Sequence, residues 1–455
     1  MIRTFQKACL TMILLNAILG FAARASAQVQ ETVLYRFQGD SDGDGPVGSV
    51  VLDKAGNIFG ATTYTLGCIT SFQCGAVYEL SPPQQPGDPW TETSLYDFQG
   101  NDSGDAGAPG GGLIQDAEGN LYGSTSYGGG GPCILLGTPV GCGVVYELIR
   151  PVQPGGAWTE KILYRFQGGE DGQFPIGDLV FDERGNLYGV TWFGGGKGDS
   201  NTCNALYPYC GTVFELTPPR TTGPDVWTEK VLYSFQGLDY GDGGQPNGGL
   251  VFDRAGNIYG TTWVGGTSGN NCKYGCGTVY KLTPPTQQSG VWTEIILHLF
   301  SNYPKDGSAP NGNLILSYGA LLGTTQGGGK SEEGTVYALR PDQNGSWTET
   351  FLYVFTQGQD GASPTALVVG PHRSLYGTAG GSPTRGGLIF RIEPPSQKGM
   401  NWSFTTLYDF IGSPDGYGPI TLRLADANTI FGATLSGGDE NCVRGGCGTV
   451  FQLTH

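Results

Sequence analysis

The residues that could do chemistry in this chain are mainly carboxylates and aromatic rings, because imidazoles are scarce. The sequence contains 40 acidic residues but only three histidines, His298, His372 and His455. Nucleophilic catalysis of the Ser-His-Asp type therefore has little support, whereas a pair of carboxylates could still hydrolyse a glycosidic bond. The acidic residues are too many for one catalytic pair to be chosen. A carbohydrate-active hydrolase or lyase therefore stays an alternative function.

Aromatic residues follow one recurring glycine-rich motif at four places. The motif occurs as GNIFGAT, GNLYGST, GNLYGVT and GNIYGTT, and the aromatic residues next to it are Tyr64, Tyr127, Trp192 and Trp263. Aromatic faces suit sugar rings and protein partners. We therefore predict that these four side chains contact a glycan or protein ligand. The alternative is that they pack over disulfides in the loops that follow.

Acidic residues recur in an Asp-Gly-x-x-Pro sequence, whose Asp returns at spacings of 54 to 71 residues. Its copies begin at Asp42, Asp171, Asp242, Asp306, Asp360 and Asp415, and Asp105 begins an imperfect copy. The pattern is typical of a turn in which Asp accepts hydrogen bonds from nearby amides, Gly adopts a positive φ and Pro begins a strand. The alternative is a ring of carboxylates that binds a cation.

One acidic cluster suggests a specific cation. Asp40, Asp42 and Asp44 imitate the start of a calcium-binding loop. However, Val51 stands at the twelfth position, where such a loop has a bidentate Glu. Calcium at these three residues is therefore an alternative interpretation, and the sequence otherwise predicts no cofactor.

Ten of the 11 cysteines fall into close pairs along the sequence. The pairs are Cys68 with Cys74, Cys133 with Cys142, Cys203 with Cys210, Cys272 with Cys276, and Cys442 with Cys447. Each pair lies in the loop after the glycine-rich motif, which predicts local disulfides formed in an oxidising compartment. Metal binding is the alternative, but no histidine lies near these loops and no paired CxxC spacing occurs.

Four short elements recur through the chain and must position these residues. An apolar run after a proline comes first, the glycine-rich motif second, a GTVFEL-like segment third and a WTEKILYRF-like segment fourth. β-Branched and aromatic residues dominate each element, with Gly, Pro and Asp between them, which is typical of strands joined by turns. The pattern indicates seven repeats of four strands.

We predict an all-β fold, a seven-bladed β-propeller with four-stranded blades. After residue 27 the chain begins with a fourth element, residues 29–37, and the last repeat stops after its third element. The last blade is thus expected to be completed by the N-terminal strand, which leaves no open edge. A right-handed β-solenoid is the alternative, but its repeats are usually shorter.

Two positions of the fourth element are interpreted as structural. Its Trp recurs so evenly that we expect it to pack between blades. His298 stands where other repeats have Tyr, and we interpret it as a packed or surface histidine and not as a general base.

The N-terminus has the composition of a secretory signal peptide. Arg3 and Lys7 precede an apolar stretch, and Ala25-Ser26-Ala27 provides small residues for cleavage after residue 27. Residues 28–455 are then expected to form a single propeller domain, secreted or periplasmic, without membrane insertion. The net charge of −16 disfavours nucleic acid and anionic membranes as partners, and we expect a monomer.

The same motifs recur in a fixed order, a GNLYGTT-like strand, a glycine-rich loop, GTVFxL, LYxF and DGxxP, over essentially all of the chain after residue 27. This order resembles the GloVer (Gloeo/Verruco) tandem repeat of bacterial exported proteins. Repeats five to seven depart from it; for example, Leu322 replaces the aromatic residue before Gly323. The resemblance implies export and repeat identity, and it implies no enzymatic activity.

The repeats are not equally elaborated. Long, cysteine-containing loops with aromatic residues lie in repeats one to four, whereas repeats five and six lack them. This asymmetry predicts a contact surface on one sector of the loop face. We therefore expect a non-enzymatic binding protein for a glycan or protein; a hydrolase or lyase, and a purely structural surface protein, are the alternatives.

Overall fold

The computed structural model describes residues 29–39, 42–65, 74–196, 203, 209–219, 226–269, 272–287, 290–301, 304–381, 386–397, 399–439, 442 and 445–455. These residues lie mainly in antiparallel strands, and their only helices are the short 3₁₀ turns η1 (Asn101–Ser103), η2 (Leu238–Tyr240) and η3 (Pro371–Arg373). The signal peptide predicted for residues 1–27 lies outside the described residues. In the part of the chain that the structure describes, no helix is long and apolar enough to cross a membrane.

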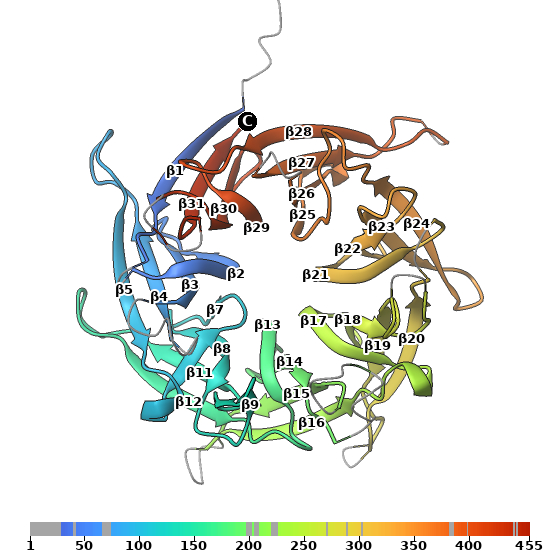
Figure 1. The fold of residues 1–455 in the computed structure, drawn as a ribbon, viewed down its shortest axis with the longest axis horizontal. Helices are drawn as coiled ribbons and strands as arrows, with labels where there is room; N and C mark the ends of the chain where they lie inside the picture. Colours follow the sequence, from blue (N-terminus) through green and yellow to red (C-terminus); the bar gives the residue numbers. More distant parts are fainter. Residues whose placement is uncertain are drawn as a thin grey trace, which may run out of the picture.

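Seven antiparallel sheets surround a central axis as the blades of a propeller (Figure 1). The first blade contains β2 (Asp44–Leu52), β3 (Ile58–Tyr64), β4 (Gly75–Ser81) and β5 (Thr91–Phe98). The second contains β6 (Ala106–Pro109) and β7 (Ile114–Gln115) at its inner edge, then β8 (Leu121–Gly128), β11 (Val144–Ile149) and β12 (Thr159–Arg165). A small hairpin, β9 (Ile134–Leu135) with β10 (Thr138–Pro139), lies in its loop.

The other blades repeat this order from the axis outwards. The third blade contains β13 (Gln173–Phe181), β14 (Leu187–Phe193), β15 (Thr212–Thr217) and β16 (Thr228–Ser234). The fourth contains β17 (Gly243–Phe252), β18 (Ile258–Gly265), β19 (Thr278–Thr283) and β20 (Thr293–Leu299). The fifth contains β21 (Gly307–Ser317), β22 (Ala320–Gly328), β23 (Thr335–Pro341) and β24 (Trp347–Val354). The sixth contains β25 (Leu367–Val369), β26 (Leu375–Ala379), β27 (Gly387–Glu393) and β28 (Ser403–Phe410).

The first and last strands of the described chain meet in the seventh blade. This sheet has the order β29 (Tyr417–Leu424), β30 (Thr429–Ser436), β31 (Thr449–Thr454) and β1 (Gln30–Arg36). β1 pairs antiparallel with β31, from Gln30 opposite Thr454 to Arg36 opposite Thr449. Figure 1 shows the blue β1 beside the red β31, so the ring is closed by the N-terminal strand. The prediction of a seven-bladed propeller closed in this way is confirmed.

The hydrophobic core is divided into seven clusters, each between two consecutive blades. The Trp of the outer strand packs on an aromatic residue of the preceding blade. Trp90 lies 6.3 Å from Phe431 and Trp158 lies 6.2 Å from Phe59, measured between ring centroids. The expected packing of these tryptophans between blades is confirmed. Most of the stabilisation by burial therefore comes from contacts between blades.

Four of the predicted disulfides are present. They join Cys133 to Cys142, Cys203 to Cys210, Cys272 to Cys276, and Cys442 to Cys447. Cys74 is disulfide-bonded too, and its predicted partner Cys68 lies outside the described residues. The two cysteines of each of these four bridges are 4 to 9 residues apart in the sequence, so the bridges stiffen loops within a blade and do not join blades.

We expect removal of residues 29–37 to open the ring. Phe37 is fully buried and lies 5.0 Å from the ring of Tyr78 in the first blade, so the deletion would remove an outer strand and part of a core cluster. Differential scanning calorimetry should record a melting temperature lower by at least about 10 °C than that of a chain beginning at Gln28. An unchanged melting temperature would argue against closure by this strand.

Candidate functional site

Two of the predicted ligand-binding residues, Trp192 and Trp263, lie side by side. Trp192 follows Thr191, which pairs with Pro175, and Trp263 follows Thr262, which pairs with Pro246, so they occupy equivalent positions on adjacent blades. Their ring centroids are 6.3 Å apart, with the rings tilted by 39°. Both side chains are half-buried.

Aromatic contacts continue from this pair towards the second blade. Trp192 lies 5.0 Å from Phe193, Phe193 lies 6.2 Å from Phe174, and Phe174 lies 5.4 Å from Tyr127. We call Tyr127, Phe174, Phe193, Trp192 and Trp263 the aromatic row. The two phenylalanines are buried beneath its half-buried members, so the row is supported from within and partly open to solvent.

The four predicted aromatic residues belong to two different strand positions. In each of these blades a Thr of the second strand pairs with a Pro of the first strand, and this pair gives a common reference point. Tyr64 lies two residues after its Thr, whereas each tryptophan lies one residue after its Thr. Because successive side chains of a strand point to opposite faces, Tyr64 and the tryptophans project to opposite sides of their blades. Tyr127 pairs with Gly107, two residues beyond the Thr125–Pro109 pair, so it shares the register of Tyr64. It joins the row of the tryptophans through its contact with Phe174.

The aromatic row packs against a core cluster that contains a disulfide. Tyr127 and Trp192 pack against the core cluster that contains Cys133 and Cys142. The bridge therefore belongs to the support of the row, while the half-buried faces of the two side chains are still partly accessible.

A central cavity of about 420 Å³ lies between the inner strands. The polar side chains in its wall are Ser49, Asp178, Asn247, Asn311, Asn313 and Arg423, among others. Leu435 also lines this cavity, and it follows Thr434, which pairs with Pro419. Leu435 therefore occupies in the seventh blade the position of the two tryptophans, which themselves do not line the cavity.

Asp178 connects several blades across the cavity. Its carboxylate accepts hydrogen bonds from the Gly112 amide at 2.7 Å, from the Asn313 side chain at 2.7 Å and from the Ser49 hydroxyl. These donors come from the second, fifth and first blades. Among the described residues that line the cavity, Asp178 is the only carboxylate. The cavity wall therefore does not present the two facing carboxylates that glycoside hydrolysis requires.

The inner strands approach one another closely beside this carboxylate. Gly177 and Gly248 have φ values of 75° and 82°. Gly177 lies at an irregularity in the pairing of β13 with β14, and Gly248 lies at the equivalent irregularity in the pairing of β17 with β18. A Cβ atom on Gly177 would collide with the Gly248 carbonyl. Glycine is therefore required here both by the backbone conformation and by the close contact between blades.

Carboxyl groups lie together at six of the seven blade interfaces, and the sequence motifs alone did not predict these clusters. At the interface between the third and fourth blades, the Tyr233 hydroxyl on the outer strand β16 donates to Asp242 at 2.9 Å. Asp242 also interacts with Glu294 on β20, the outer strand of the fourth blade. We call such a set an interblade acid cluster. The equivalent Asp–Glu pairs are Asp42 with Glu92, Asp105 with Glu160, Asp171 with Glu229, Asp306 with Glu349, and Asp415 with Glu31.

Burial and the neighbouring Asp raise the pKa of each of these glutamates. Burial is the larger cause, and the pKa reaches about 7 for Glu31, Glu92 and Glu229, about 8 for Glu160 and Glu294, and about 9 for Glu349. Their carboxyl groups therefore retain protons near neutral pH. The WTE, LYxF and DGxxP motifs are all visible in the sequence, but only the packing of consecutive blades brings their polar residues together.

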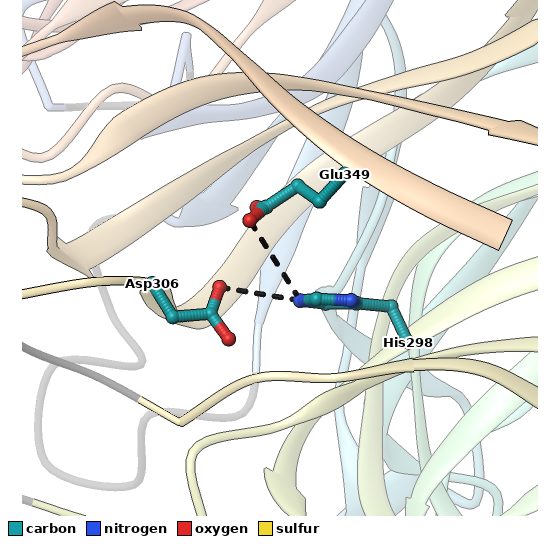
Figure 2. A group of neighbouring side chains, drawn as sticks. All are labelled: His298, Asp306 and Glu349. Atoms are coloured by element: carbon teal, nitrogen blue, oxygen red, sulfur yellow. Dashed lines mark hydrogen bonds and ion pairs between the residues drawn. The ribbon is translucent and has the colours of Figure 1, made fainter.

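Two interfaces depart from this pattern. Between the fifth and sixth blades, Phe404 replaces the Glu and stacks on Tyr353 at 4.4 Å between ring centroids. Between the fourth and fifth blades, His298 replaces the Tyr, and its Nε2 atom lies 3.2 Å from Asp306 and 3.9 Å from Glu349 (Figure 2). Burial alone would raise the pKa of Asp306, but the hydrogen bond and charge of His298 hold it below its ordinary value.

The acidic residues considered for calcium have structural contacts. Asp42 is buried and accepts hydrogen bonds at 2.9 Å from the Tyr35 hydroxyl and from the Gln38 amide, which supports the turn interpretation of the Asp-Gly-x-x-Pro sequence. Asp44 is the first residue of β2, and Asp40 lies outside the described residues. Calcium binding at these residues stays a prediction.

Comparison with known proteins identifies the repeat. The Gloeobacter/Verrucomicrobia repeat matches residues 21–270 and 201–451, which together cover almost the whole chain. The chain belongs to this repeat family. The expected resemblance is thereby confirmed. No functionally curated protein matches the sequence.

Several solved structures are similar to this chain at low sequence identity. The PQQ-bound aldose sugar dehydrogenase of Streptomyces coelicolor is 12% identical, with 94% of this chain and 98% of that chain covered and a TM-score of 0.42. A luciferin-regenerating enzyme is 11% identical, with 94% and 96% covered and a TM-score of 0.42. A computationally designed protein is 11% identical, with 92% and 98% covered and the same TM-score of 0.42.

We expect the protein to be most stable in mildly acidic solution. The six glutamates bind protons more tightly in the folded chain than in the unfolded chain, where they titrate near 4.5. Their stabilising contribution is complete below about pH 4.5 and is lost as the pH rises to about 7–9. The melting temperature should therefore fall by at least about 5 °C between pH 5.5 and pH 8.5.

Glu229→Gln provides the matched variant for this prediction, because the amide has the shape of the protonated carboxyl and does not ionise. Its melting temperature should depend less on pH than that of the unsubstituted protein. A melting temperature that rises from pH 5.5 to pH 8.5 would contradict the assignment of protonated glutamates.

We also expect Asp178→Ala to destabilise the ring by about 1–3 kcal/mol, because Ser49, Gly112 and Asn313 would lose their shared acceptor. Asp178→Asn keeps the size of the side chain and one acceptor oxygen, so its effect should be smaller. Equilibrium unfolding in urea measures both. An unchanged free energy of unfolding in the alanine variant would show that solvent replaces these contacts at no cost.

Proposed function

We propose that the protein is an exported, non-enzymatic binding protein that holds a neutral glycan on the aromatic row. The observation that carries this proposal is the contact between the half-buried Trp192 and Trp263 rings, 6.3 Å apart on adjacent blades. Neighbouring indole rings on adjacent blades offer a flat, partly desolvated surface to the C–H faces of consecutive sugar units.

The charge of the chain favours a neutral ligand. With a net charge of −16, the surface repels phosphate- or sulfate-rich partners over distances comparable to the Debye length. A neutral glycan has no such penalty, and its hydroxyl groups could be bound by the amide and hydroxyl side chains of the cavity wall, such as Asn247 and Asn311.

Binding is favoured over hydrolysis by the location of the carboxyl groups. The Asp–Glu pairs lie in the interblade acid clusters, where the Asp is hydrogen-bonded to a Tyr or His side chain. The described wall of the cavity contributes Asp178 alone, and its oxygens accept hydrogen bonds from three blades. A glycosidase would need two carboxyl groups on opposite sides of a bound sugar ring.

Export is proposed from two features. The N-terminal residues 1–27 have the composition of a signal peptide, and the four described disulfides are typical of proteins that fold in an oxidising compartment. We place the protein in the periplasm or outside the cell on these grounds.

A glycan array on the purified full chain, with calcium and with a chelator, tests the proposed ligand class. The Trp192→Ala, Trp263→Ala double variant should bind the selected glycan at least roughly tenfold more weakly in isothermal titration calorimetry, because the stacking surface is lost. Tyr318→Ala is the matched control, since this exposed aromatic residue lies at the β21–β22 turn, away from the row.

Unchanged affinity in a folded double variant would contradict binding on the aromatic row. Hydrolysis of the bound glycan would favour the enzymatic alternative. Loss of binding in chelator alone would add a calcium requirement, which the sequence offered as an alternative at Asp40, Asp42 and Asp44.

A further inference from the structure

The interface between the fourth and fifth blades differs from its six counterparts at one position. Six interfaces have a tyrosine whose hydroxyl donates to the Asp of the turn. His298 occupies this position in β20, where it pairs with Val279 as the equivalent Tyr233 pairs with Val213. The exchange places an imidazole nitrogen beside two carboxyl groups that the repeat already brings together.

The three side chains converge on one small volume. They come from β20, from the residue before β21, and from β24, and Figure 2 shows both carboxyl groups directed at the same end of the imidazole. One ligand atom from each of His298, Asp306 and Glu349 lies within 4.8 Å of the others, and this is the one such group of three among the described residues. The separations from His298 Nε2 are 3.2 Å and 3.9 Å.

These separations suit a bound metal ion. Nitrogen and oxygen ligands at about 2.0–2.2 Å from a tetrahedral ion lie about 3.3–3.6 Å from each other. Small side-chain rotations would therefore admit an ion between the three groups. The side chains retain exposures of 18%, 10% and 12%, so the cluster is largely buried and still open to solvent along one edge.

The surrounding contacts hold two of the ligands in place. Asp306 accepts hydrogen bonds from the Ser301 amide at 2.9 Å and from the Gly307 amide at 2.7 Å, and the Ser301 hydroxyl donates to it at 3.1 Å. The His298 ring lies edge-on to Phe300, 4.7 Å between centroids. Such contacts around the ligands fix their orientation, as in known metal centres.

The protein groups leave room for further ligation. Glu349 Oε1 is buried and has no hydrogen-bond partner in the protein, so this oxygen is available to an ion. A divalent ion would displace the proton that Glu349 holds, and one imidazole and two carboxylates would then balance its charge. Water can complete its coordination. The imidazole favours zinc or a similar transition metal over calcium and magnesium, which prefer oxygen ligands.

We propose that His298, Asp306 and Glu349 form a binding site for a divalent transition-metal ion, of which Zn²⁺ is the representative, between the fourth and fifth blades. The site is separate from the aromatic row and from the proposed glycan. The ion would join the outer strands of two adjacent blades at the one interface where the hydrogen bond of the repeat tyrosine is missing.

The repeat supplies matched variants for a test. His298→Tyr restores the residue found at the other six interfaces, so this variant is expected to fold and to lack the site. Tyr233→His makes the converse exchange beside Asp242 and Glu294, and it should create a second site. Glu349→Gln removes one charged ligand and keeps the shape of the side chain.

Titration of the untagged, chelator-treated full chain with ZnCl₂ measures the stoichiometry and affinity by calorimetry. The unsubstituted protein should bind one equivalent that His298→Tyr does not bind, Glu349→Gln should bind it at least roughly tenfold more weakly, and Tyr233→His should bind one equivalent more. Visible absorption of bound Co²⁺ should follow the same order and report nitrogen and oxygen ligation.

Equal zinc stoichiometry in the unsubstituted protein and in folded His298→Tyr would overturn the proposal. So would the absence of binding of Zn²⁺ and Co²⁺ to the unsubstituted protein, which would identify the cluster as a hydrogen-bonded ion pair alone. If His298→Tyr fails to fold, the Glu349→Gln and Tyr233→His variants decide between these outcomes in the same way.

Discussion

A blade of this propeller can bury its two faces only against the blades on either side, and the last blade can do so only if the ring closes. The pairing of β1 with β31 provides that closure and covers the edge of the last sheet. Each of the seven core clusters spans two blades, so the core of the molecule is a continuous ring of contacts between neighbours. The cavity, the aromatic row and the acid clusters all depend on this closed arrangement.

The closed ring also explains why polar groups from distant parts of the sequence meet. An outer-strand Tyr and a turn Asp of one repeat approach the Glu of the next, and burial raises the pKa of that Glu. Most interfaces have the same Tyr, Asp and Glu, so an exchange at one of these positions is easily recognised. Phe404 turns one cluster into an aromatic stack, whereas His298 turns another into a set of three metal-ligating side chains. A regular scaffold thus makes local departures informative about function.

The aromatic row was predicted from the sequence only in part. The aromatic residues after the glycine-rich motif were visible as candidates, and three of them, Tyr127, Trp192 and Trp263, lie in one row. Tyr64 and Tyr127 share one strand position and the two tryptophans share another, and Tyr127 joins the row through its contact with Phe174. The two buried phenylalanines that connect the row could not be selected, since a strand of alternating residues does not reveal which neighbours its side chains meet across a blade interface.

The sequence by itself determined the number of repeats, the four strands in each, the closing role of residues 29–37 and the local pairing of the described cysteines, because these follow from short motifs at regular spacing. Tertiary structure alone decided which residues of consecutive repeats touch. The His298, Asp306 and Glu349 cluster joins residues from two blades, and Asp178 joins blades that are not neighbours in sequence. Such contacts depend on the twist, stagger and closure of the ring, which no single repeat encodes.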